Sequence, residues 1–75
     1  MQNMSNVTMG ARARCLSREI KVEKKPMSDQ FTIIAGKNRE EMNGWERTSS
    51  KLKKLGCNDV QIQTVKIDLE DYYME

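Results

Sequence analysis

Alternation of apolar and polar residues predicts a strand in the first third of the chain. Leu16, Ile20 and Val22 share one parity, and the residues between them on the other parity are polar or charged. A period of two is typical of a strand with one buried face. Arg18 falls on the apolar parity, so we expect it near an edge, with its side chain reaching out past its neighbours.

A turn and a second strand follow. Pro26, Ser28 and Asp29 mark residues 24–29 as a turn, because proline cannot donate to a ladder and short polar side chains favour local turn hydrogen bonds. Residues 30–35 then read as a strand. Its buried face is expected to hold Phe31, Ile33 and Ala35. Two strands joined by a short turn should pair as an antiparallel hairpin.

The clearest helix signal covers residues 38–55. Asn38 is a good N-cap, and Glu41 stands three residues later, as a capping box requires. Gly56 supplies the usual C-terminal stop, and acidic and basic residues at the two ends match the helix dipole. The stripe expected to face the sheet is Met42, Trp45, Leu52 and Leu55, with Ser49 completing the spacing.

Residues 59–69 read as a third strand. The apolar positions change parity midway, which indicates either a bulge near Gln63 or Thr64 or a strand partly covered on both faces. The two apolar sets are Val60 and Ile62, then Val65, Ile67 and Leu69.

The predicted fold class is therefore α+β, in the order β-β-α-β. We expect a three-stranded, mainly antiparallel sheet with one helix packed on one face and the other face bare. Residues 1–10 are predicted to form a flexible tail. Residues 11–75 are predicted to form a single domain that ends in a short acidic tail containing two tyrosines.

Length and cysteine content limit the class of protein. Seventy-five residues make one domain at most, near the size at which a single apolar core is only just sufficient. Cys15 and Cys57 lack the spacing of a metal site. We expect two half-buried thiols in a cytoplasmic protein, with one bridge in an oxidising compartment as the alternative. No apolar run suits a membrane span or a signal peptide, so no membrane partner is expected.

The residue types argue against catalysis. The chain has no histidine, which removes the commonest general base and most zinc sites. The neighbouring carboxylates Glu40-Glu41 and Glu70-Asp71 are better explained as solvated charges than as acid/base pairs. Residues 36–39 could offer a helix N-terminus to a phosphate, but capping explains them better. We expect no enzyme activity, no metal and no cofactor.

Charge and exposed apolar residues then point to binding. Residues 1–25 carry six basic and two acidic side chains, whereas residues 57–75 carry one and five. The basic segment could meet an acidic surface, or it could be a solvated strand edge blunted against aggregation. The two tail tyrosines could contact a partner or pack over an open end of the core. The candidate partner-binding residues are Arg12, Arg14, Arg18, Lys21, Lys24, Lys25, Ile34, Tyr72 and Tyr73.

Two functions follow from these candidates. The first is a small interaction protein that binds a larger protein or ribonucleoprotein complex and inhibits or regulates it. In element order alone, β-β-α-β resembles several small phage-encoded inhibitors of host defence, including some anti-CRISPR proteins, and the resemblance implies a similar mode of action. The alternative is a nucleic-acid-binding accessory domain, although aromatic residues for base stacking are not expected on the sheet. It would use Arg14, Lys21, Lys51, Lys53 and Lys54.

Overall fold

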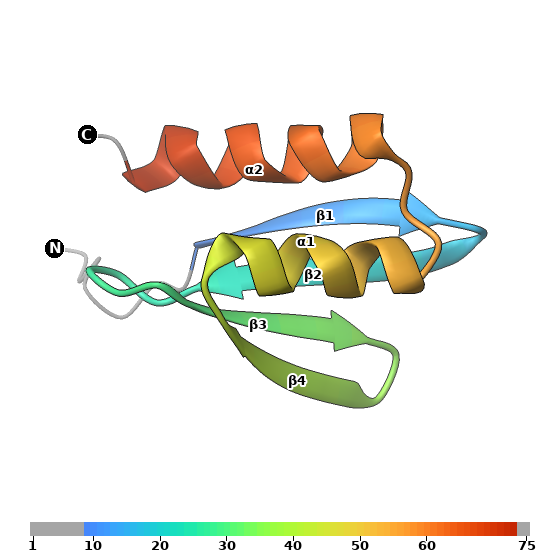
Figure 1. Cartoon of the computed structure of the whole chain (residues 1–75), viewed down its shortest axis with the longest axis horizontal. Coiled ribbons are helices and arrows are strands. Elements are labelled where there is room, and N and C mark those ends of the chain that lie inside the picture. The colour runs from blue at the N-terminus through green and yellow to red at the C-terminus, as the bar shows by residue number, and fades with distance from the viewer. Residues whose placement is uncertain (1–8, 74–75) are drawn as a thin grey trace, which may run out of the picture.

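A computed structural model describes the backbone of residues 9–73 and the side chains of residues 10–70. It shows a four-stranded antiparallel sheet in the order β1-β2-β3-β4, followed by two helices (Figure 1). The α+β class is confirmed, but the prediction of three strands and one helix is wrong. The elements are β1 (Met9–Cys15), β2 (Arg18–Lys24), β3 (Gln30–Ala35), β4 (Asn38–Asn43), α1 (Trp45–Lys54) and α2 (Asp59–Tyr73).

The first predicted strand is one arm of a hairpin. β1 pairs with β2 in antiparallel register, with Cys15 opposite Arg18, so Leu16 and Ser17 form a two-residue loop. Both loop residues have positive φ, 52° and 66°, as a type I′ turn requires to match the twist of its strands. Leu16 is therefore 79% exposed and lies outside the core in which it was predicted. Most of the predicted N-terminal tail, residues 1–8, lies outside the described residues, whereas Met9 and Gly10 belong to β1.

The central part of the sheet matches the prediction. The β2–β3 turn falls in residues 25–29, and β3 covers residues 30–35. Val22 lies opposite Ile33, and Ile20 lies opposite Ala35. The predicted buried positions of β2 and β3 are all confirmed, namely Ile20, Val22, Phe31, Ile33 and Ala35.

The first part of the predicted helix is a strand. Gly36, with a φ of 65°, and Lys37 form a two-residue loop, and β4 then pairs with β3 so that Met42 lies opposite Phe31. The predicted capping box of Asn38 and Glu41 is wrong, because both residues lie in β4. Pairing with β3, which is already buried on one face, outweighs the local helix signal. It gives hydrogen-bond partners to the backbone groups along an edge of β3 that would otherwise be unpaired.

Helix α1 is short and packs by its apolar stripe. It begins after Gly44, whose φ of 92° turns the chain from the strand into the helix. Leu52 is fully buried, and Trp45 meets Phe31 edge to face with ring centroids 5.6 Å apart. Trp45 and Leu55 are half-buried against the core, as the predicted stripe requires. Met42 is also half-buried there, but it lies in β4 and not on the helix.

The predicted third strand is helix α2. Ile62, Val65 and Leu69 are buried, at spacings of three and four residues, whereas Val60 and Ile67 are exposed. The parity change that indicated a bulge is therefore the periodicity of a helix. Asn58 and Gln61 form the capping box of α2. The Asn58 Oδ1 accepts from the Gln61 N–H at 2.8 Å, and the Gln61 Oε1 accepts from the Asn58 N–H at 2.9 Å.

A disulfide joins Cys15 to Cys57 across 42 residues of chain. The expectation of two thiols is therefore wrong. The bond connects the end of β1 to the loop between α1 and α2, and both cysteines are buried. Beside it, the Gln61 Nε2 donates to the carbonyl oxygen of Arg14. These contacts fasten the start of α2 to the end of β1.

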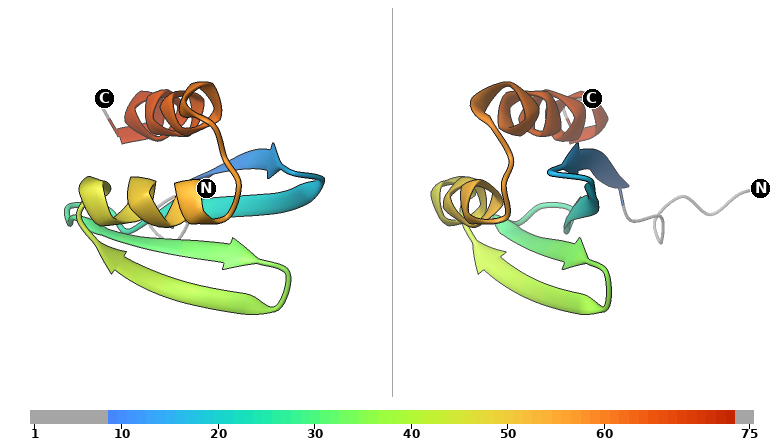
Figure 2. Two further views of the ribbon diagram at one scale, coloured as in Figure 1. Left: turned by 45° about the vertical axis from the view of Figure 1, so that its right-hand side comes forward. Right: turned by 90° about the vertical axis from the view of Figure 1, so that its right-hand side faces the viewer.

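The two helices lie on the same face of the sheet (Figures 1 and 2). α2 packs over β1 and the nearer side of β2, and α1 packs over β3 and β4. Among the described residues nothing covers the other face, as the sequence predicted. We call this uncovered surface the open face.

Candidate interaction surface

The open face is built from alternate residues of all four strands. The register places these side chains opposite the buried set, so they point away from both helices. The open face consists of Gly10, Arg12, Arg14, Glu19, Lys21, Glu23, Gln30, Thr32, Ile34, Arg39, Glu41 and Asn43.

One row of residues crosses the sheet from edge to edge. Arg12 lies opposite Lys21, Lys21 opposite Ile34, and Ile34 opposite Arg39. Directly opposed residues in an antiparallel sheet have Cβ atoms about 5 Å apart. The row therefore brings three basic side chains around one half-buried apolar side chain at the centre of the open face.

The next row carries the opposite charge. Glu23 lies opposite Thr32, and Thr32 opposite Glu41. The Lys21 Nζ lies 3.1 Å from a carboxylate oxygen of Glu23, so the two rows are linked along β2. The open face is thus divided along the strands, with Glu23 and Glu41 toward the β2–β3 turn and the basic row toward the other end.

Acidic residues also reduce the charge at the basic end. A guanidinium nitrogen of Arg12 lies 3.8 Å from a carboxylate oxygen of Glu19, and both side chains are largely exposed. Such exposed pairs contribute little stability. The strands place four basic and three acidic side chains on the open face, so its net charge is small.

The centre of the open face is slightly hollowed. A shallow depression of about 320 Å³ is lined by Arg12, Glu19, Lys21, Ile34 and Gly36. Gly36 leaves space at its side, because no heavy atom beyond its two chain neighbours lies within 4 Å of the position its Cβ would take. The depression has an apolar floor at Ile34 and a charged rim, which is the usual arrangement of a protein-binding patch.

The structure separates the predicted partner-binding residues. Arg12, Arg14, Lys21 and Ile34 lie together on the open face. Arg18 falls on the helix side of β2, where it lines a small pocket of about 90 Å³ with Leu55 among others.

The remaining candidates lie elsewhere or outside the described side chains. Lys24 ends β2 on the helix-side parity, and its Nζ donates to the carbonyl oxygen of Lys25 in the following turn. Tyr72 and Tyr73 lie in the last turn of α2, but their side chains are outside those that the structure describes.

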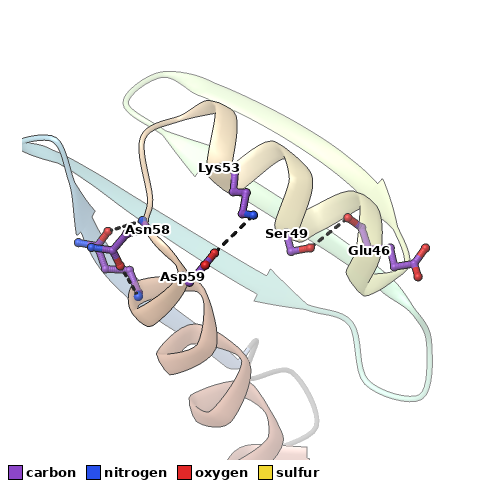
Figure 3. A network of polar contacts seen from close by, with 6 residues as sticks. Glu46, Ser49, Lys53, Asn58 and Asp59 are labelled. Atoms are coloured by element: carbon purple, nitrogen blue, oxygen red, sulfur yellow. Dashed lines mark hydrogen bonds and ion pairs between the residues drawn. The ribbon is translucent and has the colours of Figure 1, made fainter.

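The predicted nucleic-acid set is divided between two sides of the molecule. Arg14 and Lys21 lie on the open face, whereas Lys51, Lys53 and Lys54 lie on α1, on the opposite side of the sheet. The Lys51 Nζ lies 3.0 Å from a carboxylate oxygen of Glu40. The Lys53 Nζ lies 3.4 Å from a carboxylate oxygen of Asp59, and this ion pair connects the two helices (Figure 3). These lysines and the basic row do not form a continuous surface.

Arg39 and Glu41 were missed as surface residues because the sequence placed them in a helix. The signal that could have found them is the pair Gly36-Lys37, since glycine followed by a polar residue between two short strands is typical of a two-residue hairpin. Residues 11–15 carry another missed signal, because Ala11, Ala13 and Cys15 alternate with arginines.

Within the described residues, no group of three or more acidic or cysteine side chains is arranged to hold a metal ion. Both cysteines are in the disulfide. None of the described helices is both long enough and apolar enough to cross a membrane.

Comparison with known protein families, curated proteins and solved structures finds no match to this chain. The resemblance in element order to small phage-encoded inhibitors rested on a β-β-α-β arrangement. That arrangement is not observed, because four strands precede two helices.

Proposed function

We propose that this chain is a non-enzymatic interaction protein that binds a larger protein or ribonucleoprotein complex through its open face and so inhibits or regulates it. The observation that carries the proposal is the row Arg12–Lys21–Ile34–Arg39 on a sheet face that none of the described residues covers. A small domain with helices on one side only leaves the other side of its sheet available to a partner.

The charge pattern favours a protein partner over a nucleic acid. Nucleic-acid surfaces concentrate Lys and Arg, and their affinity comes mainly from phosphate contacts. On the open face, Glu19 and Glu23 lie beside Arg12 and Lys21 at ion-pair distances, and a third carboxylate, Glu41, lies on β4. Mixed charges around an apolar centre suit the surface of another protein, where both signs find partners.

A matched pair of substitutions tests this proposal. Ile34→Glu places a carboxylate at the centre of the open face, and Ile67→Glu makes the same change at a 47% exposed position on α2. Both variants and the unchanged chain are used to capture proteins from lysate of the native cells, with and without nuclease treatment, and the captured proteins are identified by mass spectrometry. We expect a protein that is retained by the unchanged chain and by Ile67→Glu and is lost with Ile34→Glu.

Two results would overturn the proposal. One is capture of the same proteins by all three chains, which would place binding elsewhere. The other is specific binding that disappears with nuclease treatment, together with oligonucleotide affinity that falls steeply with salt and is lost on charge reversal at Arg14 and Lys21. Circular dichroism and thermal unfolding of the two variants establish that they are folded.

The disulfide changes the proposed location. The sequence predicts a cytoplasmic location together with two free thiols, and the disulfide removes the thiols as a reason for it. Buried disulfides persist in oxidising compartments, so we propose that the protein works in one of these or on the outside of a cell. Alkylation of free thiols in the protein as it comes from its native cells tests this. Labelling of Cys15 and Cys57 without a reductant would support the cytoplasm instead.

A further inference from the structure

Strand β4 has an unpaired edge. Among residues 9–73 it pairs only with β3, and five of its six residues are exposed. In an antiparallel ladder, alternate residues turn their backbone groups toward the neighbouring strand. The Gly44 N–H donates to the Asp29 carbonyl oxygen at 2.7 Å, which continues the ladder and sets this alternation. Asn38, Glu40 and Met42 therefore face β3, whereas Arg39, Glu41 and Asn43 direct their N–H and C=O groups outward.

We propose that this edge is a homodimer interface, in which β4 pairs in antiparallel fashion with β4 of a second copy, and Arg39 lies opposite the partner's Glu41. The two-fold axis repeats this Arg–Glu pair, because Glu41 then lies opposite the partner's Arg39. Position 40 lies on the axis. Both members of each Arg–Glu pair carry outward backbone groups, so the pairs coincide with the hydrogen-bonded positions of the new ladder.

Charge complementarity selects this register over its neighbours. A shift by one step of the ladder places Glu41 opposite itself, and the shift in the other direction places Arg39 opposite itself. Like charges directly opposite one another destabilise a strand pair, whereas opposite charges stabilise it. Only the proposed register gives both charged open-face residues of β4, Arg39 and Glu41, a partner of opposite charge.

The unfavourable contact in this register is Glu40 opposite the partner's Glu40 on the helix side. In each copy this carboxylate already has a cation, since the Lys51 Nζ lies 3.0 Å from it. The two-fold axis would therefore gather two carboxylates and two ammonium groups. An ion-pair network of this kind removes the repulsion that an unpaired glutamate would cause.

The helix layer leaves room for a second copy at this edge. A groove of about 430 Å³ lies between α1 and β4, so α1 leaves part of the helix side of this strand uncovered. Its lining carries both charge signs around one apolar side chain, and it consists of Glu40, Met42, Glu46, Arg47, Ser50, Lys51 and Lys54. A two-fold axis beside such a groove brings two self-complementary surfaces together. The resulting dimer has one continuous eight-stranded sheet and one continuous open face.

This inference does not depend on the proposed function, and charge exchange tests it. Sedimentation velocity measures the mass of the chain as a function of concentration. We expect the unchanged chain to form a dimer of twice 8.7 kDa. Arg39→Glu and Glu41→Arg should each weaken dimerisation about tenfold or more, because both pairs become like-charged. An equimolar mixture of the two variants should form a heterodimer, and the double variant should restore the homodimer.

Matched controls carry the same charge changes away from the edge. Lys25→Glu in the β2–β3 turn and Asp68→Arg on α2 are exposed positions and should leave dimerisation unchanged. An unchanged chain that remains monomeric up to about 1 mM overturns the proposal. So does a dimer that tolerates both single variants, because its contact must then lie elsewhere. A mixture of the two variants that stays monomeric overturns the register.

Discussion

The Leu16 side chain lies directly against Gly56, so close that a β-carbon on the glycine would overlap it. Leu16 belongs to the β1–β2 loop, and Gly56 follows α1 with a φ of 99°. Leu16 directly follows Cys15 and Gly56 directly precedes Cys57, so both residues are chain neighbours of the disulfide. The bridge, the loop and the glycine therefore form a single junction between the sheet and the helix layer.

Gly56→Ala should destabilise the protein by about 2 kcal/mol or more. The substitution adds the left-handed backbone cost of a non-glycine residue to a collision with Leu16. Urea unfolding followed by circular dichroism measures the change. Gly36→Ala is the matched control, because its φ is also positive while the space around it is empty. It should cost only the backbone contribution, about 1 kcal/mol. Equal effects at the two positions would contradict the role given to the Leu16 contact.

Replacing Leu16-Ser17 by Asn-Gly should stabilise the hairpin. Both residues now hold positive φ without being glycine, and Asn-Gly is the preferred pair for a type I′ turn. The expected gain is about 1 to 2 kcal/mol, read as a rise in the thermal midpoint. A lower midpoint would mean that the contact between Leu16 and Gly56 contributes more than the backbone strain costs.

Loss of the disulfide should cost a large part of the stability. For a loop of 42 residues, the chain-entropy treatment gives about 4 kcal/mol. A domain of this size has little stability to lose. We expect a marked fall in the urea midpoint on adding a reductant, and a similar fall for the double variant Cys15→Ala/Cys57→Ala. A midpoint that is unchanged by reduction would contradict the expectation.

The capping box of α2 can be separated from its contact with β1. Asn58→Ala should cost about 1 kcal/mol, whereas Asn58→Asp should keep the cap, because aspartate also accepts the Gln61 N–H. Gln61→Glu keeps the acceptor for the Asn58 N–H but loses the amide that donates to the Arg14 carbonyl. Protection of α2 amides from hydrogen exchange should therefore fall with Asn58→Ala and Gln61→Glu, but not with Asn58→Asp. Equal protection in all three variants would show that the cap and this contact contribute little.

The sequence predicted the centre of the sheet because its pattern there has one interpretation. Phe31, Ile33 and Ala35 alternate between clear turn signals, and β3 is confirmed residue by residue. The bare open face was also predicted, because one layer of helix cannot cover two faces. The sequence therefore predicts the correct surface for Ile34, and the structure places Lys21 opposite it.

Two elements were assigned wrongly because local signals competed. Asn38 and Glu41 match a capping box, yet strand pairing through Met42 and Phe31 decides the outcome. In residues 59–69, Val60 and Ile67 are apolar but exposed, and they obscured the helical spacing of the buried residues. The disulfide could not be deduced from spacing, because its formation depends on how the fold brings Cys15 and Cys57 together.

The cross-link also makes residues 15–57 a closed covalent ring that includes β2, β3, β4 and α1. β1 and α2 are the two arms outside this ring, and α2 packs on β1 (Figure 1). A protease that cuts the ring once, for example in the exposed turn at Met27, opens the ring but releases no fragment. The nicked chain should run as one species on a non-reducing gel and as two after reduction. Damage to that turn would therefore leave both arms attached to the same molecule.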